Sequence, residues 1–236
     1  MNSIQEKVNR LKKNIEQVIF GKGETIEFVI TCLLAKGHLL IEDVPGVGKT
    51  SLAHCLASSL QLEFKRIQFT NDLLPADITG VSIYDQQEKS FHFKQGPLFA
   101  NIVLADEINR STPRTQSALL EAMNEKQVSV DNNTHILEEP FMVIATQNLI
   151  ESQGTYPLPE SQLDRFMFYI SMGYPSQDDE RRLLQDQSFR PNPANIETVL
   201  EREEVLELQA IVNSVRIEPV LTDYILNIIN ATRQDP

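Results

Sequence analysis

The feature that most constrains the fold is a glycine-rich segment at residues 41–51, Ile41-Glu42-Asp43-Val44-Pro45-Gly46-Val47-Gly48-Lys49-Thr50-Ser51. It follows a short apolar run at 38–41, which predicts a strand, and it opens a predicted helix at 49–60. Gly46 and Gly48 let the backbone turn with its N–H groups inward, and these donors favour phosphate oxygens at the helix start. The segment therefore predicts a phosphate-binding loop formed by residues 43–51.

Two side chains of this loop carry its chemistry. Lys49 is expected to place a cation between the β- and γ-phosphates of a nucleotide, and the Thr50 hydroxyl is expected to ligate Mg²⁺. Asp43 stands where the strict pattern has glycine, but aspartate tolerates unusual backbone angles better than most residues. The alternative interpretation is a Gly/Pro turn between strand and helix that binds nothing.

Polar side chains follow two further apolar runs. Residues 102–105 predict a strand buried on both faces, and it ends in Asp106 and Glu107. Because ligands bind at the carboxyl edge of parallel sheets, we expect Asp106 to hold Mg²⁺ through a water and Glu107 to deprotonate an attacking water. Asn148 ends the run at 143–148 and is expected to contact the γ-phosphate or that water. A plain strand end or cap is the alternative for each.

The remaining periodicity predicts an α/β core followed by a helical appendage. Further predicted strands and hairpins lie at 64–69, 81–84 with 90–93, 128–130 with 134–137, 141–146 and 166–170. Predicted helices of the core lie at 3–19, 24–36 and 113–125. After residue 173 the pattern predicts helices only, at 177–189, 201–213 and 219–232. The chain is therefore divided into a core at 1–173 and an appendage at 174–236.

Charge and composition argue against several classes of protein. The 236 residues hold 21 Lys and Arg against 33 Asp and Glu, a net charge of −12, so the basic footprint of a nucleic-acid-binding surface is missing. No apolar run approaches the roughly 20 residues of a membrane span, and the N-terminus lacks the apolar stretch of a secretory signal. Cys32 and Cys55 are not paired as C-x-x-C, which favours free thiols in the cytoplasm.

These motifs resemble those of the AAA+ ATPases and, within them, the MoxR family, over roughly residues 10–235. The segments that carry the resemblance are 42–50, 68–80, 96–99, 105–123, 145–148 and 158–166. The resemblance implies a five-stranded parallel sheet of order 5-1-4-3-2 with helices on both faces, followed by a partial all-α lid. It also implies that Lys49 and Thr50 belong to Walker A, that Asp106 and Glu107 form Walker B and that Asn148 is sensor 1, with Asp43 a normal variation.

The same resemblance assigns further segments. Arg165 is similar to the arginine finger that reaches the ATP of a neighbouring subunit; without the family, an ion pair with Asp164 or Glu160 is favoured. Gly21-Lys22 resembles the segment beside the adenine, and residues 80–100 and 127–138 resemble insertions that face the pore or a partner. Phe91, Phe93 and Phe99 would then either face that partner or pack on the sheet. Family members carry a sensor 2 arginine in a later lid helix, and Arg233 lies too early in this sequence to be assigned that role.

The function implied is that of a MoxR-type ATPase that binds and hydrolyses ATP with Mg²⁺. Such a protein forms a ring, here expected to be a hexamer that assembles with ATP, and remodels or matures protein complexes. Partners bearing a von Willebrand factor A domain are expected, and the client is unspecified. Two alternatives remain open at this point: an ATP-gated binding or scaffold module with little turnover, and the ATPase subunit of a metal chelatase.

Overall fold

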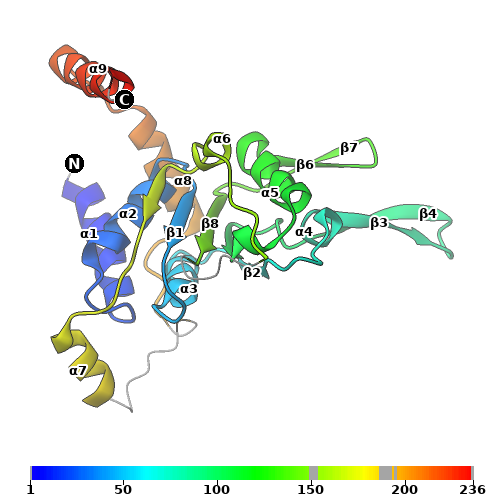
Figure 1. Ribbon diagram of the computed structural model, residues 1–236, viewed down its shortest axis with the longest axis horizontal. Coiled ribbons are helices and arrows are strands. Elements are labelled where there is room, and N and C mark those ends of the chain that lie inside the picture. Colours follow the sequence, from blue (N-terminus) through cyan, green and yellow to red (C-terminus); the bar gives the residue numbers. More distant parts are fainter. Residues whose placement is uncertain (1, 149–153, 186–192, 194–195, 235–236) are drawn as a thin grey trace.

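The computed structural model describes residues 2–148, 154–185, 193 and 196–234 (Figure 1). Its centre is a parallel sheet of β1 (Leu39–Glu42), β2 (Phe64–Gln68), β5 (Ile102–Asp106), β8 (Met142–Gln147) and β9 (Phe168–Ile170). The five strands lie in the order β2-β5-β8-β1-β9, and every neighbouring pair is parallel. Counted among these strands alone and from the other edge, this is 5-1-4-3-2, so the predicted topology is confirmed.

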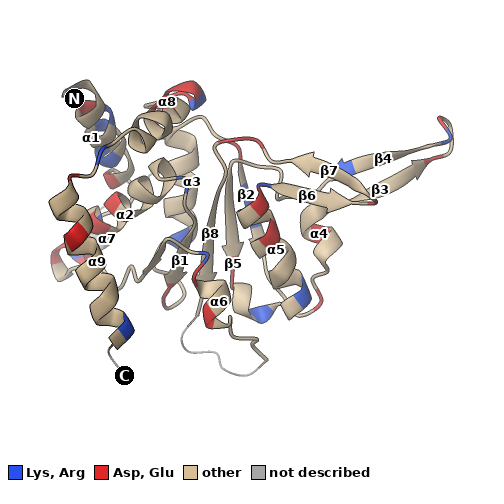
Figure 2. Cartoon of the chain, turned by 90° about the horizontal axis from the view of Figure 1, so that it is seen from above, with Lys and Arg blue, Asp and Glu red and all other residues tan. Residues whose placement is uncertain are grey.

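Alternate residues of the central strands point into two separate cores. Leu39, Ile41 and Ile144 pack with α1 (Asn2–Glu16), α2 (Gly23–Leu34) and α3 (Lys49–Ser59) on one face. Leu40, Val103 and Ala145 pack with α5 (Pro113–Glu125) on the other face. Figure 2 shows these helices on opposite sides of the sheet. Burial on both faces explains why these strands are continuous apolar runs.

Two antiparallel hairpins extend from the α5 side. They are formed by β3 (Gly80–Asp85) with β4 (Ser90–Gln95) and by β6 (Gln127–Val130) with β7 (Asn133–Ile136). Both were expected, and the β3–β4 hairpin projects furthest from the body (Figure 1). The ring of Phe93 stacks on His135 with centroids 3.8 Å apart and meets Phe99 edge-on. Phe91, in contrast, is 72% exposed, so packing applies to two of the phenylalanines and exposure to the third.

Three short helical turns differ from the predicted loops. They are α4 (Pro75–Thr79), the 3₁₀ turn η1 (Ile108–Arg110) and α6 (Glu160–Leu163). Elements of one turn show no apolar periodicity, and local hydrogen bonds set them instead. In α4, for example, the Leu74 backbone N–H donates to Asp77 Oδ2 at 2.8 Å, which caps the helix start.

The helices after residue 173 are α7 (Gln177–Gln185), α8 (Arg202–Asn213) and α9 (Pro219–Gln234). The end of the helix predicted at 177–189 lies outside the described residues. Helix α8 buries Val205 and Leu208 in the core beside α1–α3, and Lys7 forms an ion pair with Glu204 at 2.7 Å. Every residue of α9 is exposed, and the helix stands apart from the body (Figure 1). Over the described residues, no helix combines the length and apolar character needed to cross a membrane.

Candidate nucleotide-binding site

The glycine-rich loop connects β1 to α3 at the carboxyl edge of the sheet. Gly46 and Gly48 have φ of +88° and +98°, the left-handed region that side chains rarely adopt. A Cβ at either glycine would meet no heavy atom within 4 Å. The two glycines are therefore required by the backbone conformation of the loop, and not by a lack of space around it.

Asp43 fills a different role from the glycine of the strict pattern. Its backbone is not in the left-handed region, so conformational freedom is not needed there. Its Oδ2 accepts hydrogen bonds from Ser171 Oγ, Met172 N and Gly173 N, at 3.0, 2.7 and 2.6 Å, and Oδ1 accepts from Val44 N at 2.8 Å. Burial alone raises the pKa of Asp43, but these donors outweigh it and the pKa is lowered. The carboxylate therefore ties the loop to the segment that follows β9.

Lys49 begins α3 and is buried at the centre of the site. Its Nζ donates to the carbonyls of Asp43 and Val44, both at 3.1 Å, and to Asn148 Oδ1 at 3.4 Å. Burial lowers the pKa of Lys49, and the carboxylates of Asp43, Asp106 and Glu107 oppose that shift. A buried cation held by neutral oxygens is suited to an anionic ligand.

Asp106 ends β5 beside the loop and is 9% exposed. Its Oδ1 accepts a hydrogen bond from Thr146 Oγ1 at 2.6 Å. Its Oδ2 accepts from the Nε and Nη2 of Arg66 on β2, at 3.1 and 2.6 Å. The sequence prediction did not include Arg66 or Thr146. Arg66 alternates with Gln68 along β2, next to the end of β5, and that spacing was the available signal.

Glu107 has φ +57°, a strained conformation for a residue other than glycine, of the kind concentrated at functional sites. Its backbone N–H donates to Thr146 Oγ1 at 2.9 Å. Its carboxylate accepts hydrogen bonds from three side chains: Asn148 Nδ2 at 2.9 Å, Gln68 Nε2 at 3.0 Å and Arg110 Nη1 at 3.1 Å. The Asn148 amide thus joins Glu107 to Lys49.

These side chains surround one cavity of about 370 Å³. Its lining residues are Pro45, Gly46, Gly48, Lys49, Thr50, Ser51, Arg66, Asp106, Glu107 and Asn148. The structure therefore brings together six of the nine predicted loop residues, both carboxylates and Asn148, whereas Asp43, Val44 and Val47 do not line the cavity. Thr50 and Asp106 offer a hydroxyl and a carboxylate to the same cavity, and Mg²⁺ prefers oxygen donors of this kind together with water and phosphate. The donor set therefore fits Mg²⁺.

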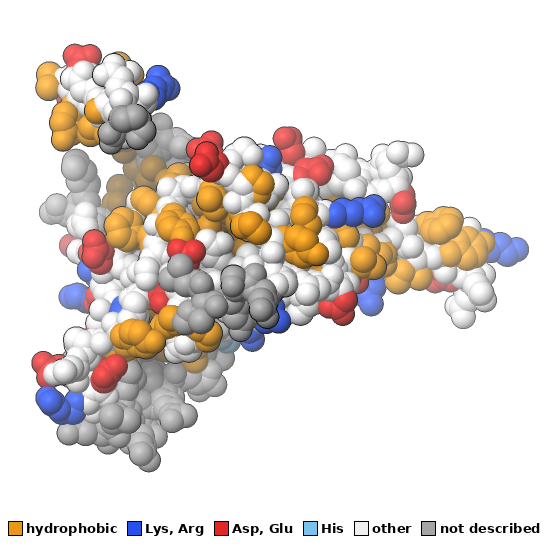
Figure 3. All heavy atoms as spheres, in the orientation of Figure 1, with side chains coloured by type: hydrophobic (Ala, Val, Ile, Leu, Met, Phe, Trp, Pro, Cys, Tyr) orange, Lys and Arg blue, Asp and Glu red, His pale blue; other side chains and the backbone are white. Residues whose placement is uncertain are grey.

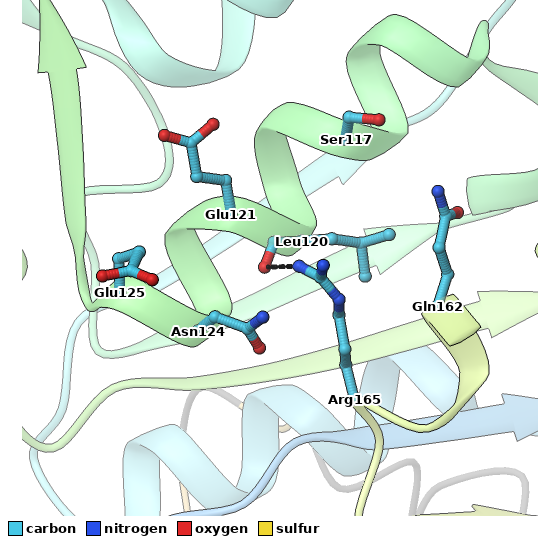
Figure 4. A pocket seen from close by; sticks show the side chains of 7 residues that line it. All are labelled: Ser117, Leu120, Glu121, Asn124, Glu125, Gln162 and Arg165. Carbon is cyan, nitrogen blue, oxygen red and sulfur yellow. Dashed lines mark hydrogen bonds between the residues drawn. The ribbon is translucent and has the colours of Figure 1, made fainter.

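Arg165 lines a different cavity, of about 290 Å³, with Ser117, Leu120, Glu121, Asn124, Glu125 and Gln162 (Figure 4). Its Nη1 donates to the carbonyl oxygen of Leu120 on α5 at 2.8 Å. Arg165 precedes β9, whereas the glycine-rich loop follows the parallel strand β1. The two features therefore lie at opposite edges of the sheet, and Arg165 is not brought into the cavity around Lys49.

The fold and the cavity together define a P-loop protein of the AAA+ class. The family model "ATPase family associated with various cellular activities (AAA)" matches residues 38–168. The crystal structure of a candidate ATPase from Cytophaga hutchinsonii superposes with a TM-score of 0.88 at 40% identity, covering 98% of this chain and 70% of that one.

Similar proteins with curated names indicate which family of the AAA+ class the chain resembles. The chain is 51% identical to the uncharacterized protein YeaC of Bacillus subtilis, over 95% of its own length and 70% of that protein. It is 43% identical to the chaperone MoxR1 of Mycobacterium tuberculosis, over 93% of its length and 58% of that protein. Protein MoxR of Methylorubrum extorquens is 27% identical. The chain belongs to the MoxR family of AAA+ ATPases, and the predicted resemblance is confirmed.

Proposed function

We propose that the chain binds Mg·ATP in the cavity around Lys49 and hydrolyses it. The observation that carries this proposal is the continuous chain of contacts from Lys49 through Asn148 to Glu107. It connects a buried cation suited to phosphate with a carboxylate suited to water activation, around one cavity. A site that only bound nucleotide would not need a carboxylate held in a strained backbone position beside that cation.

Each residue then has a distinct role. The N–H groups of the loop and Lys49 Nζ hold the phosphates. Thr50 and Asp106 would hold Mg²⁺, which when bound would neutralise the charge that develops on the phosphate oxygens. Glu107 orients a water and accepts its proton as the water oxygen attacks the γ-phosphorus, and the bond from phosphorus to the leaving ADP oxygen breaks. Asn148 keeps Glu107 aimed at that water.

Arg165 acts, in this proposal, on the ATP of a second copy of the chain. The support is its position: it lies at the opposite edge of the sheet from its own glycine-rich loop. The Leu120 carbonyl holds the guanidinium in a surface cavity (Figure 4), where an incoming subunit could place its phosphates. Successive copies joined in this head-to-tail way form a ring when the rotation between them closes, and we propose a hexamer that assembles with ATP.

The biological role proposed is the chaperone-like remodelling of protein complexes, with residues 174–236 acting as a partial lid. The name of the mycobacterial relative, chaperone MoxR1, supports the first part. The β3–β4 hairpin supplies a surface for protein contacts, because Ile83, Tyr84 and Phe91 are 49%, 50% and 72% exposed. Figure 3 shows this apolar surface at the projecting end of the molecule. Proteins with von Willebrand factor A domains are the proposed partners.

ATP turnover by Glu107→Gln tests the catalytic part. The amide keeps the shape of the side chain and removes the proton acceptor, so turnover should fall about 10²- to 10⁴-fold while nucleotide binding persists. Glu88→Gln, on the exposed β3–β4 turn, makes the same chemical change outside the cavity and should match wild type. Equal turnover by wild type and Glu107→Gln would refute the role of Glu107. Binding and ring assembly without wild-type turnover would instead support the ATP-gated scaffold.

A further inference from the structure

Asp106, the carboxylate proposed to hold Mg²⁺, already carries a positive partner. The guanidinium of Arg66 approaches Oδ2 with Nη2 at 2.6 Å and Nε at 3.1 Å. Thr146 Oγ1 occupies Oδ1 at 2.6 Å. Both carboxylate oxygens therefore have donors, and the stronger partner is a full positive charge.

The position of Arg66 distinguishes this ion pair from a structural one. Its side chain is 48% exposed whereas that of Asp106 is 13% exposed, so the guanidinium covers the carboxylate from the open side. Arg66 also lines the cavity that contains Lys49 and Thr50. The pair therefore lies where the metal and the phosphates are expected, and is not part of either apolar core.

Oδ2 already accepts two N–H groups of Arg66, which use both of its lone pairs, and Oδ1 accepts one hydrogen bond. A hydrated Mg²⁺ brought against this carboxylate therefore meets the guanidinium on Oδ2, and the two like charges repel. We propose that Arg66 is a positioning residue that competes with Mg²⁺ for Asp106. It pairs with the carboxylate in the empty site and is displaced when Mg·nucleotide binds. Arg66 thereby sets the Mg²⁺ concentration that the site requires. This inference rests on the proposed function.

Displacement of Arg66 also reaches Glu107. The Nη2 of Arg66 donates to Gln68 Oε1 at 2.9 Å, and Gln68 Nε2 donates to Glu107 Oε2 at 3.0 Å. When the guanidinium leaves Asp106, Gln68 loses the donor that orients its amide. The Gln68 amide that donates to Glu107 is then less constrained. Binding of the metal at Asp106 therefore makes the carboxylate of Glu107 less tightly held.

The test follows binding, not turnover. A fluorescent, non-hydrolysable ATP analogue is added to the protein in metal-free buffer, and MgCl₂ is titrated until binding saturates. Arg66→Gln removes the competing charge and should lower the half-saturating Mg²⁺ concentration about two- to fivefold, the range of a partly exposed ion pair. Arg66→Lys keeps a cation and should stay within about twofold of wild type.

Lys65→Gln is the matched control. Lys65 is the neighbouring residue on β2, pairs with Glu63 at 3.2 Å and is half exposed. Its replacement by glutamine changes the net charge by the same amount as Arg66→Gln. Its half-saturating Mg²⁺ concentration should equal that of wild type. If Arg66→Gln left the midpoint unchanged, or raised it because Arg66 binds phosphate instead, the inference would be wrong. Failure of wild type itself to bind the analogue would refute the proposed function as well.

Discussion

The cavity around Lys49 and the cavity around Arg165 lie at opposite edges of one sheet and differ in what they contain. The first holds a buried lysine, an amide and a carboxylate joined by hydrogen bonds, and the carboxylate of Asp106 lines the same cavity. The second holds one arginine bound to a backbone carbonyl of α5, and Glu121 and Glu125 lie on the same helix (Figure 4). The first has the groups that phosphate chemistry needs, whereas the second has a cation and no phosphate-binding loop.

The difference reflects which residues a parallel sheet places at the carboxyl ends of its strands and which it places at the amino ends. Carboxyl ends of adjacent strands deliver Asp106, Glu107 and Asn148 to one place, next to the helix N-terminus that favours anions. The amino edge receives only the residues that enter the strands, such as Arg165. A cation at that edge acts on phosphate only if a second molecule brings the phosphate to it, which is the reason for proposing a site shared between copies.

Among substitutions outside the cavity around Lys49, Arg165→Ala is expected to have the largest effect on turnover. Loss of a guanidinium supplied to another subunit's phosphates should lower kcat about 10³-fold or more, while the affinity for Mg·ATP changes little because the cavity around Lys49 is intact. Steady-state ATPase assays and calorimetry measure the two quantities. Arg181→Ala, on the exposed face of α7, is the control and should match wild type. A large loss of affinity in Arg165→Ala would contradict the separation of the two cavities.

Lys49→Ala, in contrast to Arg165→Ala, should act mainly on the affinity for Mg·ATP. Removing a buried cation that contacts the phosphates should weaken Mg·ATP binding about 10²-fold or more, and turnover should fall because the site is empty. Isothermal calorimetry checks the affinity, with Lys65→Ala as an exposed lysine control. Unchanged binding would mean that the glycine-rich loop does not hold the nucleotide.

The sequence predicted the cavity well because its parts are short local patterns. A strand, a Gly-x-Gly-Lys-Thr turn and a helix are adjacent in the chain. Each apolar strand is followed directly in the sequence by the polar residue that it places at the site. The strand order itself followed only from the family resemblance. The helices α4 and α6 were missed because they span one turn and have no periodic signal.

Contacts between distant segments were beyond sequence reasoning. The sequence alone indicates only that aspartate is tolerated in place of glycine at position 43, whereas in the structure Asp43 binds Ser171 to Gly173, about half the chain away. Arg66 was unremarkable on its own strand until the pairing of β2 with β5 placed it beside Asp106. Such roles depend on which segments become neighbours, and hydrophobic patterning does not encode that directly.

A smaller effect is expected from His38, through the dependence of folding stability on pH. The residue is 6% exposed at the start of β1, where Nδ1 accepts from Val143 N at 3.0 Å and Nε2 lies 3.1 Å from the Met123 carbonyl. Burial lowers the pKa of His38 to about 4. Between pH 6.5 and 4 the unfolded chain binds a proton there that the folded chain refuses, so stability falls as pH falls, by about 3 kcal/mol at most.

Denaturant unfolding at pH 7.5 and 4.5 measures this contribution. His38→Gln should be less stable than wild type at pH 7.5 but should lose less stability between the two pH values, by about 2 to 3 kcal/mol. If His38→Gln kept the wild-type pH difference, the neutral buried imidazole would not be the cause. The Met167 N–H donates to the His38 carbonyl, so His38 lies at the same end of the sheet as Arg165.

A mixing experiment tests the shared site most directly. Glu107→Gln and Arg165→Ala are each purified, combined in equal amounts with ATP and assayed for hydrolysis after assembly. An Arg165→Ala subunit keeps its own Glu107, and a Glu107→Gln neighbour supplies the missing arginine, so about a quarter of the sites in a random ring are complete. We expect the mixture to recover about that fraction of the wild-type rate. A rate no higher than the mean of the two separate variants would contradict a site completed by a second copy.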